Sequence, residues 1–174
     1  MTYYIAQAIS ILVAGISVVA LQMKTMKKLL IGQILINGLA AFSYLLIKGY
    51  SAAAIGIIAV LQCCIMYYYN KQNQKPPLWV VGIFIALYIS CSAVFYQGLT
   101  DILPGFAAVL FAISVACKRP VVARTWSMIN AITWITYDCF MSAWGGLIMH
   151  MVILSSVLIA FVRVDHIFQK KSSK

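Results

Sequence analysis

Two titratable side chains stand inside apolar runs in the last third of the sequence. Asp138 occurs in "TWITYDCF" and His150 in "GGLIMHMV", on either side of the segment "SAWGG". If the two runs are consecutive helices joined at this segment, the side chains lie at a similar level and can touch. Because the chain has only three acidic residues, a carboxylate in an apolar run beside a histidine is the first candidate for chemistry.

Three roles are open for this pair. One is a structural contact, in which the carboxylate accepts a hydrogen bond from the imidazole or from a tyrosine. Another is a proton-coupling or gating element, because histidine titrates near neutral pH and carboxylate–histidine chains relay protons in transporters. The third is direct contact with a substrate, or with water nearer the surface.

Asparagine and tyrosine recur together at two places in the chain. Asn37 and Tyr44 are seven residues apart, as are Asn130 and Tyr137, so each pair shares one helix face. At about 1.5 Å per residue from the expected helix ends, both asparagines lie near the middle of a membrane. Amide and phenol groups suit a neutral polar solute such as a sugar or nucleoside. The alternative is that the asparagines hydrogen-bond neighbouring helices.

Three other residues each have two interpretations. Gln62 reaches a similar depth in the third apolar run, where it either lines a solute path or bonds another helix. Pro104 and Gly105 open the fifth run. Proline in a first turn is an ordinary helix start, and a hinge is the alternative.

Enzyme chemistry is not expected. The sequence lacks HExxH, GxSxG and a phosphate-binding glycine loop, and no second acid stands near Asp138. The five cysteines form no CxxC and are scattered along the chain, so they predict neither a metal site nor a disulfide framework. We expect no cofactor.

The composition predicts a membrane protein with several helical spans. The chain of 174 residues is 64% hydrophobic and 9% charged, whereas soluble domains are about one quarter charged. Apolar runs close to the length of about 20 residues that crosses a bilayer recur throughout, and their lack of alternation indicates helices rather than barrel strands. Seven runs are present, at 3–21, 29–47, 52–69, 78–97, 102–117, 125–141 and 146–162.

The basic residues indicate how the chain is oriented. With seven helices, all of them except Lys48 fall in the first, third and fifth loops or in the C-terminal tail. The positive-inside rule then places the N-terminus outside and the C-terminus in the cytoplasm, with the tail near anionic lipid headgroups. Because the charge sits in short loops, we expect no nucleic-acid partner. The basic residues of this side are Lys24, Lys27, Lys28, Lys71, Lys75, Lys118, Arg119, Arg124, Arg163, Lys170, Lys171 and Lys174.

A shift of 93 residues aligns the two halves of the chain. It places Asn37 on Asn130 and Tyr44 on Tyr137, which predicts a parallel repeat of helices one to three in helices five to seven, a transporter design. The predicted units are a first bundle at 1–70, a linker loop and fourth helix at 71–100, a second bundle at 101–163 and a basic tail at 164–174. The same shift aligns Asp138 with Leu45 and His150 with Ile57. Both positions are polar in one half and both are apolar in the other, as expected if the two side chains touch.

Several segments resemble the YgjV family of bacterial inner-membrane proteins. They are "DILPGFAAVLFAISVACKRP" followed by "TWITYDCFMSAWGG", and "KTMKKLLIGQ" followed by "YLLIKGYSAAAIG". The resemblance covers most of the chain and extends distantly to the PQ-loop group, which includes the SWEET, SemiSWEET and PnuC carriers. It implies an inner-membrane protein with a SWEET-like 3+1+3 fold. It also implies a bend at Pro104, although no Pro-Gln pair occurs and the first helix lacks a matching proline.

Together these observations predict a transporter or facilitator of a small polar solute, of the sugar, nucleoside or vitamin class. Its site would lie at the midplane between two three-helix bundles. The alternative is a receptor on the same fold that binds its ligand without moving it. The expected partners are the solute and membrane lipids, and the sequence is compatible with a monomer as well as a homodimer.

Overall fold

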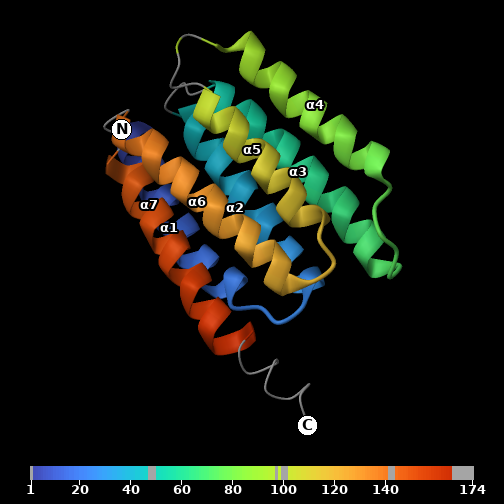
Figure 1. The fold of residues 1–174 in the computed structure, drawn as a ribbon. Helices are drawn as coiled ribbons and strands as arrows, with labels where there is room; N and C mark the ends of the chain where they lie inside the picture. Colours follow the sequence, from blue (N-terminus) through green and yellow to red (C-terminus); the bar gives the residue numbers. More distant parts are fainter. Residues whose placement is uncertain (1, 47–49, 97, 99–101, 141–143, 166–174) are drawn as a thin grey trace.

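The computed structural model describes residues 2–46, 50–96, 98, 102–140 and 144–165, and these residues form seven α-helices and one π-helical turn. Each predicted apolar run falls on one helix, so the all-helical prediction is confirmed (Figure 1). The helices are α1 (Thr2–Leu21), α2 (Met26–Leu46), α3 (Tyr50–Lys71), α4 (Leu78–Val94), α5 (Ile102–Ala116), α6 (Pro120–Phe140) and α7 (Trp144–Ala160), and the π-helical turn η2 (Phe161–Asp165) follows α7.

Four helical segments of the described residues are long and apolar enough to cross a membrane: α1, α2, α3, and α7 together with the turn η2 that continues it. The helices α4 and α5 are apolar but shorter. Large hydrophobic side chains cover the outside, with Ile11 74% and Leu78 89% exposed. So much apolar surface is costly in water, whereas lipid accommodates it.

The helices form a closed ring with one helix outside it. In the ring, α2 packs between α1 and α3, and α6 between α5 and α7, while α1 contacts α7 and α3 contacts α5. Figure 1 shows α5, α6 and α7 in front of α1, α2 and α3, with α4 at the edge against α3 and α5. The ring surrounds the centre of the protein, where the predicted polar faces of α2 and α6 can meet.

Small residues permit this close packing. A Cβ on Gly56 of α3 would lie 2.8 Å from the Cβ of Ala41 on α2, and one on Gly105 of α5 would lie 2.8 Å from Ser92 Oγ on α4. Gly105 therefore serves the α4–α5 contact. Pro104 is the third residue of α5, where its missing N–H breaks no helical hydrogen bond. This position fits the helix-start interpretation, and the hinge stays a prediction.

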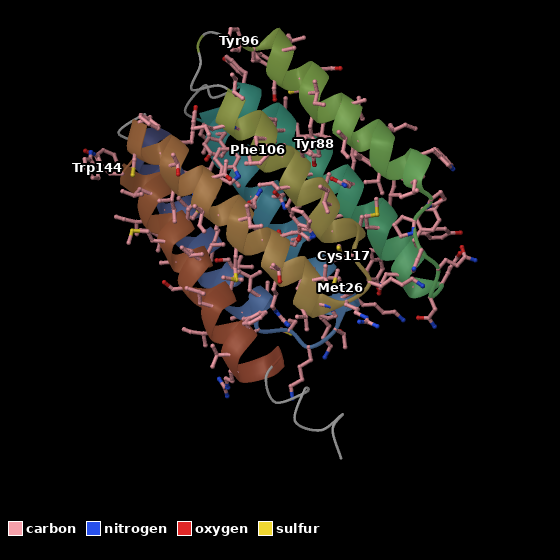
Figure 2. All side chains as sticks on the ribbon, viewed as in Figure 1. Met26, Tyr88, Tyr96, Phe106, Cys117 and Trp144 are labelled. Carbon is pink, nitrogen blue, oxygen red and sulfur yellow. The ribbon has the colours of Figure 1, made fainter. Side chains whose placement is uncertain are left out.

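The basic loops gather at one end of the bundle. Lys118 Nζ, after α5, donates a 2.7 Å hydrogen bond to the carbonyl oxygen of Asn73, after α3. Figure 2 shows Met26 and Cys117 toward this end and Tyr96 and Trp144 toward the other. Trp144 is 71% exposed, as expected of an aromatic residue at a membrane interface.

The sequence pattern placed Arg124 in the loop before the sixth helix, and this prediction is wrong. α6 begins at Pro120 rather than near residue 125, because proline is favoured in the first turn of a helix. Arg124 is thus helical and fully buried. Its Nε donates to the carbonyl oxygen of Leu21 at 3.1 Å, and its guanidinium also bonds that of Met23.

Candidate functional site

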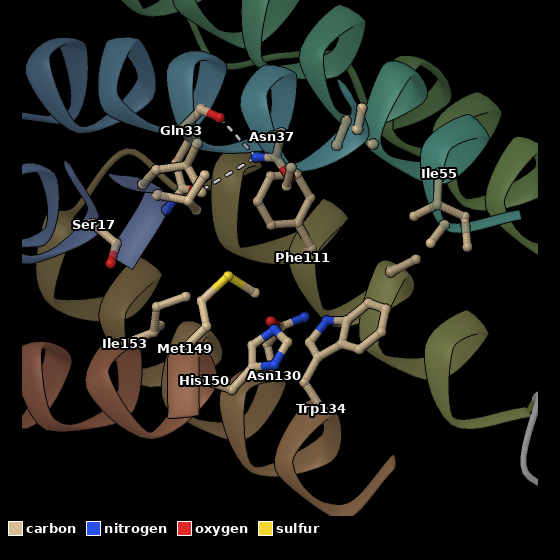
Figure 3. A pocket seen from close by; sticks show the side chains of 18 of the residues that line it. Ser17, Gln33, Asn37, Ile55, Phe111, Asn130, Trp134, Met149, His150 and Ile153 are labelled. Carbon is tan, nitrogen blue, oxygen red and sulfur yellow. Dashed lines mark hydrogen bonds between the residues drawn. The ribbon is translucent and has the colours of Figure 1, made fainter. Parts of the chain in front are cut away.

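A cavity of about 130 Å³ lies inside the ring, and all seven helices contribute to its lining (Figure 3). Its walls are mainly apolar, as is usual for small-molecule sites. Several polar side chains interrupt them, namely Ser17, Gln33, Asn37, Tyr44, Ser127, Asn130 and His150. The structure therefore brings three of the five predicted solute-binding residues, Asn37, Tyr44 and Asn130, to one cavity.

The two asparagines use their nitrogens on protein carbonyls. Asn37 Nδ2 donates to the backbone oxygen of Gln33 at 2.7 Å and to its Oε1 at 3.3 Å. Asn130 Nδ2 donates to the carbonyl oxygen of Ala107 on α5 at 2.5 Å. Because these partners only accept, they fix the orientation of both amides. Within the described residues, neither amide oxygen has a protein hydrogen-bond partner.

The two tyrosines are not equivalent. Tyr44 lines the cavity and lies within electrostatic range of Asp138 and Tyr137. Tyr137 is not part of the lining, and its ring packs edge-on against Trp134 with a centroid distance of 5.8 Å. Trp134 occupies the wall that sequence analysis expected Tyr137 to form. It lies four residues after Asn130, hence on the same helix face, and this spacing is the signal that could have identified it.

Asp138 and His150 are in contact. His150 Nδ1 lies 2.7 Å from Asp138 Oδ2, and both residues are buried. His150 lines the cavity, while Asp138 stands behind it. The ring of Trp134 stacks on the imidazole, with centroids 5.3 Å apart and planes within 4°. With Asp138 ionised, Nδ1–H donates to the carboxylate and Nε2 is the imidazole nitrogen without a described protein partner.

The absence of a side chain at Gly146 leaves room for the carboxylate of Asp138. A Cβ on Gly146 would lie 2.8 Å from Asp138 Oδ1 and 3.0 Å from Oδ2. Asp138 therefore rests against the first turn of α7, which begins at Trp144. The positive end of a helix dipole stabilises an ionised carboxylate at this position.

Substitution Gly146→Ala is expected to destabilise the protein by about 1–3 kcal/mol, because the added methyl group must displace the carboxylate. Unfolding by sodium dodecyl sulfate in mixed micelles would measure this change. Gly15→Ala is the control, because a Cβ on Gly15 would meet nothing within 4 Å. Equal stability of the two variants would contradict the packing described for Asp138.

Gln62 lies outside the cavity lining. It is fully buried, donates through Nε2 to the carbonyl oxygen of Ala112 at 3.2 Å, and accepts a 3.0 Å hydrogen bond from the Tyr88 hydroxyl. It thus links α3, α4 and α5. Of its two interpretations, this placement matches the bond between helices.

The described residues contain no group of three or more His, Cys, Asp or Glu side chains that could hold a metal ion. The arrangement can hold a small solute or move a proton between His150 and the cavity.

Comparison with known proteins places the chain in a family. Neither a curated protein nor a solved structure matches it significantly. A family model described as bacterial inner membrane protein matches residues 4–167, a span that includes Asn37, Asn130, Asp138 and His150. The chain therefore belongs to the Imp-YgjV family of bacterial inner membrane proteins.

Proposed function

We propose that this protein is a transporter or facilitator of a small polar solute, which binds in the central cavity between two three-helix units. One observation carries the proposal. Asn37 and Asn130, which a shift of 93 residues superimposes, both line the same cavity. Within the described residues both amide oxygens lack a protein partner, so both are available to bind a solute.

The helix contacts support a two-fold repeat. The shift takes α1, α2 and α3 onto α5, α6 and α7. It therefore takes the α1–α7 contact onto the α5–α3 contact, and both are present. Parallel repeats of this kind are used by transporters whose halves rock about a central site. In this proposal α4 is the linker, and the predicted SWEET-like organisation describes the two units.

The size of the cavity limits what it holds. An apolar cavity of about 150 Å³ accommodates one benzene molecule, so about 130 Å³ suits a solute with a single small ring. Sites for larger ligands measure about 300–1,000 Å³. A nucleoside or disaccharide would thus require the helices to separate, which is the movement that transport between two units needs.

The basic end of the bundle gives the proposed orientation. Lys118 and the buried Arg124 lie at the end where α1, α3 and α5 terminate. By the positive-inside rule this end faces the cytoplasm, and the N-terminus of α1 faces outward.

The test combines ligand binding with flux. Purified protein is screened for thermal stabilisation by sugars, nucleosides, vitamins and amino acids, and a ligand at roughly a hundredfold excess over Kd adds about 2.7 kcal/mol. Any stabilising compound is then followed into proteoliposomes. We expect Asn37→Ala and Asn130→Ala each to weaken binding about tenfold, since each removes an acceptor from a desolvated site.

Ser155→Ala is the matched control, because Ser155 is exposed and is not part of the cavity lining. Binding without flux would instead indicate a receptor on the same fold. A ligand that binds the two asparagine variants as tightly as the original protein would show that the cavity is not its site.

A further inference from the structure

We propose that the solute is a small organic cation and that it exchanges with a proton on His150. This inference rests on the proposed function and narrows its polar solute to a positively charged one. The observations behind it are the charge balance around Asp138, the hydrogen-bonding character of the lining and the aromatic rings of the cavity.

The charge balance requires one positive charge beside Asp138. Of the residues whose burial is described, Asp138 is the sole buried acid, and His150 is its ionic partner. Arg124 and Arg163 are about 20 Å away along their helices at 1.5 Å per residue. An isolated buried carboxylate is costly, and in this proposal a proton on His150 or a bound cation balances it.

Among the described residues, the other titratable groups near the pair do not supply this charge. Tyr44 of α2 and Tyr137 of α6 face it, and both are neutral near pH 7. Neither α1 nor α5 contains a charged residue, and the basic residues of α2 stand in its first turn at the basic end. The first turn of α7 favours a negative charge on Asp138, and we assign the exchanged proton to His150, whose imidazole bonds this carboxylate and lines the cavity.

The cavity presents hydrogen-bond acceptors. The amide nitrogens of Asn37 and Asn130 are bonded to protein oxygens, which leaves the amide oxygens as the groups available to a solute. When His150 is neutral with its proton on Nδ1, Nε2 adds another acceptor. No lysine or arginine is in the described lining. Together with the carboxylate behind His150, and without a lysine or arginine in the described lining, these acceptors favour a cation over an anion.

Aromatic rings complete the site. Tyr44, Tyr88, Phe111 and Trp134 all line the cavity. The faces of such rings attract ammonium groups, most strongly where water is excluded. Acceptor oxygens, aromatic faces and a carboxylate behind His150 together form a site for a small ammonium ion.

The exchange step conserves charge. Before binding, the site holds an ionised Asp138 and a protonated His150. When the cation enters, the imidazolium releases its Nε2 proton to water in the cavity, and the cation is held on the cavity side of the imidazole, whose Nδ1–H still bonds the carboxylate. The net charge of the site is the same in both states. In each direction across the membrane the site therefore carries one positive charge, either the proton or the solute.

Choline is the probe, because a quaternary ammonium ion cannot cross lipid unaided or carry a proton itself. Proteoliposomes with a trapped pH dye receive labelled choline from outside. We expect saturable choline uptake with a simultaneous rise in internal pH. The uncharged isostere 3,3-dimethylbutan-1-ol should neither compete with choline nor change the pH. Choline uptake without a pH change would overturn the exchange.

Variants separate a transport role from a structural one. Asp138→Asn keeps the shape of the side chain and should reduce choline uptake at least about tenfold. His150→Gln removes the side chain that carries the proton, so net choline uptake and the internal pH rise should both be lost, whereas exchange of labelled for unlabelled choline, which needs no proton, should remain measurable. Thr136→Val is the control, because Thr136 is exposed and its hydroxyl bonds its own helix.

The measurement on the original protein decides the question even if a variant does not fold. Flux of a neutral solute that choline does not inhibit would overturn the cation inference and leave the proposed function standing. Absence of flux for choline and for every neutral solute of the panel would overturn both.

Discussion

Substitution His150→Ala is expected to destabilise the folded protein by about 3–5 kcal/mol, because it leaves the buried carboxylate of Asp138 without its partner. Asp138→Ala should cost less, about 1–3 kcal/mol, since a lone histidine can release its proton and leave only an unpaired N–H. The structural basis is the 2.7 Å contact between two buried side chains. Unfolding by sodium dodecyl sulfate at pH 7 would measure both variants.

The double variant makes this prediction sharper. Residues in direct contact show coupling energies of about 0.5–3 kcal/mol, so the double variant should lose less stability than the two single losses added together. Thr136→Ala on the exposed face of α6 should stay within about 0.5 kcal/mol of the original protein. Strictly additive losses would mean that the two side chains do not depend on each other.

Substitution Arg124→Met should cost about 3 kcal/mol, since hydrogen bonds to a charged group contribute about 1.5–3 kcal/mol each. Methionine keeps much of the length of the side chain but leaves the carbonyl oxygens of Leu21 and Met23 without the guanidinium. A cation is also favourable at the C-terminus of a helix such as α1. The same denaturation assay gives the measurement.

Arg119→Met is the control for charge alone, because Arg119 is exposed at the same end of the protein. It should stay within about 0.5 kcal/mol of the original protein. Equal stability of the two arginine variants would show that the hydrogen bonds of Arg124 to the end of α1 do not contribute to the free energy of unfolding.

These two predictions concern opposite ends of α6. Arg124 and Asp138 are separated by about 21 Å along the helix at 1.5 Å per residue, and Asn130 lies between them. Arg124 ties α6 to the end of α1, and Asp138 ties it to α7.

The positions of the helices could be predicted from the sequence, because a run of about 20 apolar residues has few alternatives to a helix in lipid. The contact between Asp138 and His150 could also be predicted, from their level on consecutive helices and from the paired change in the repeat. The repeat also predicted that Asn37 and Asn130 lie on two faces that meet at the centre, and both residues line the central cavity. These inferences depend on local spacing or on internal similarity, both of which are present in the chain itself.

The tertiary structure decided which face of each helix meets which neighbour. Gln62 bonds Ala112 and Tyr88 rather than lining the cavity, and Trp134 rather than Tyr137 forms its wall. Arg124 is buried because it meets the end of α1, 103 residues away in sequence. Nearly every position of these helices is apolar, so periodicity gives little information about rotation, and packing between distant segments determines it.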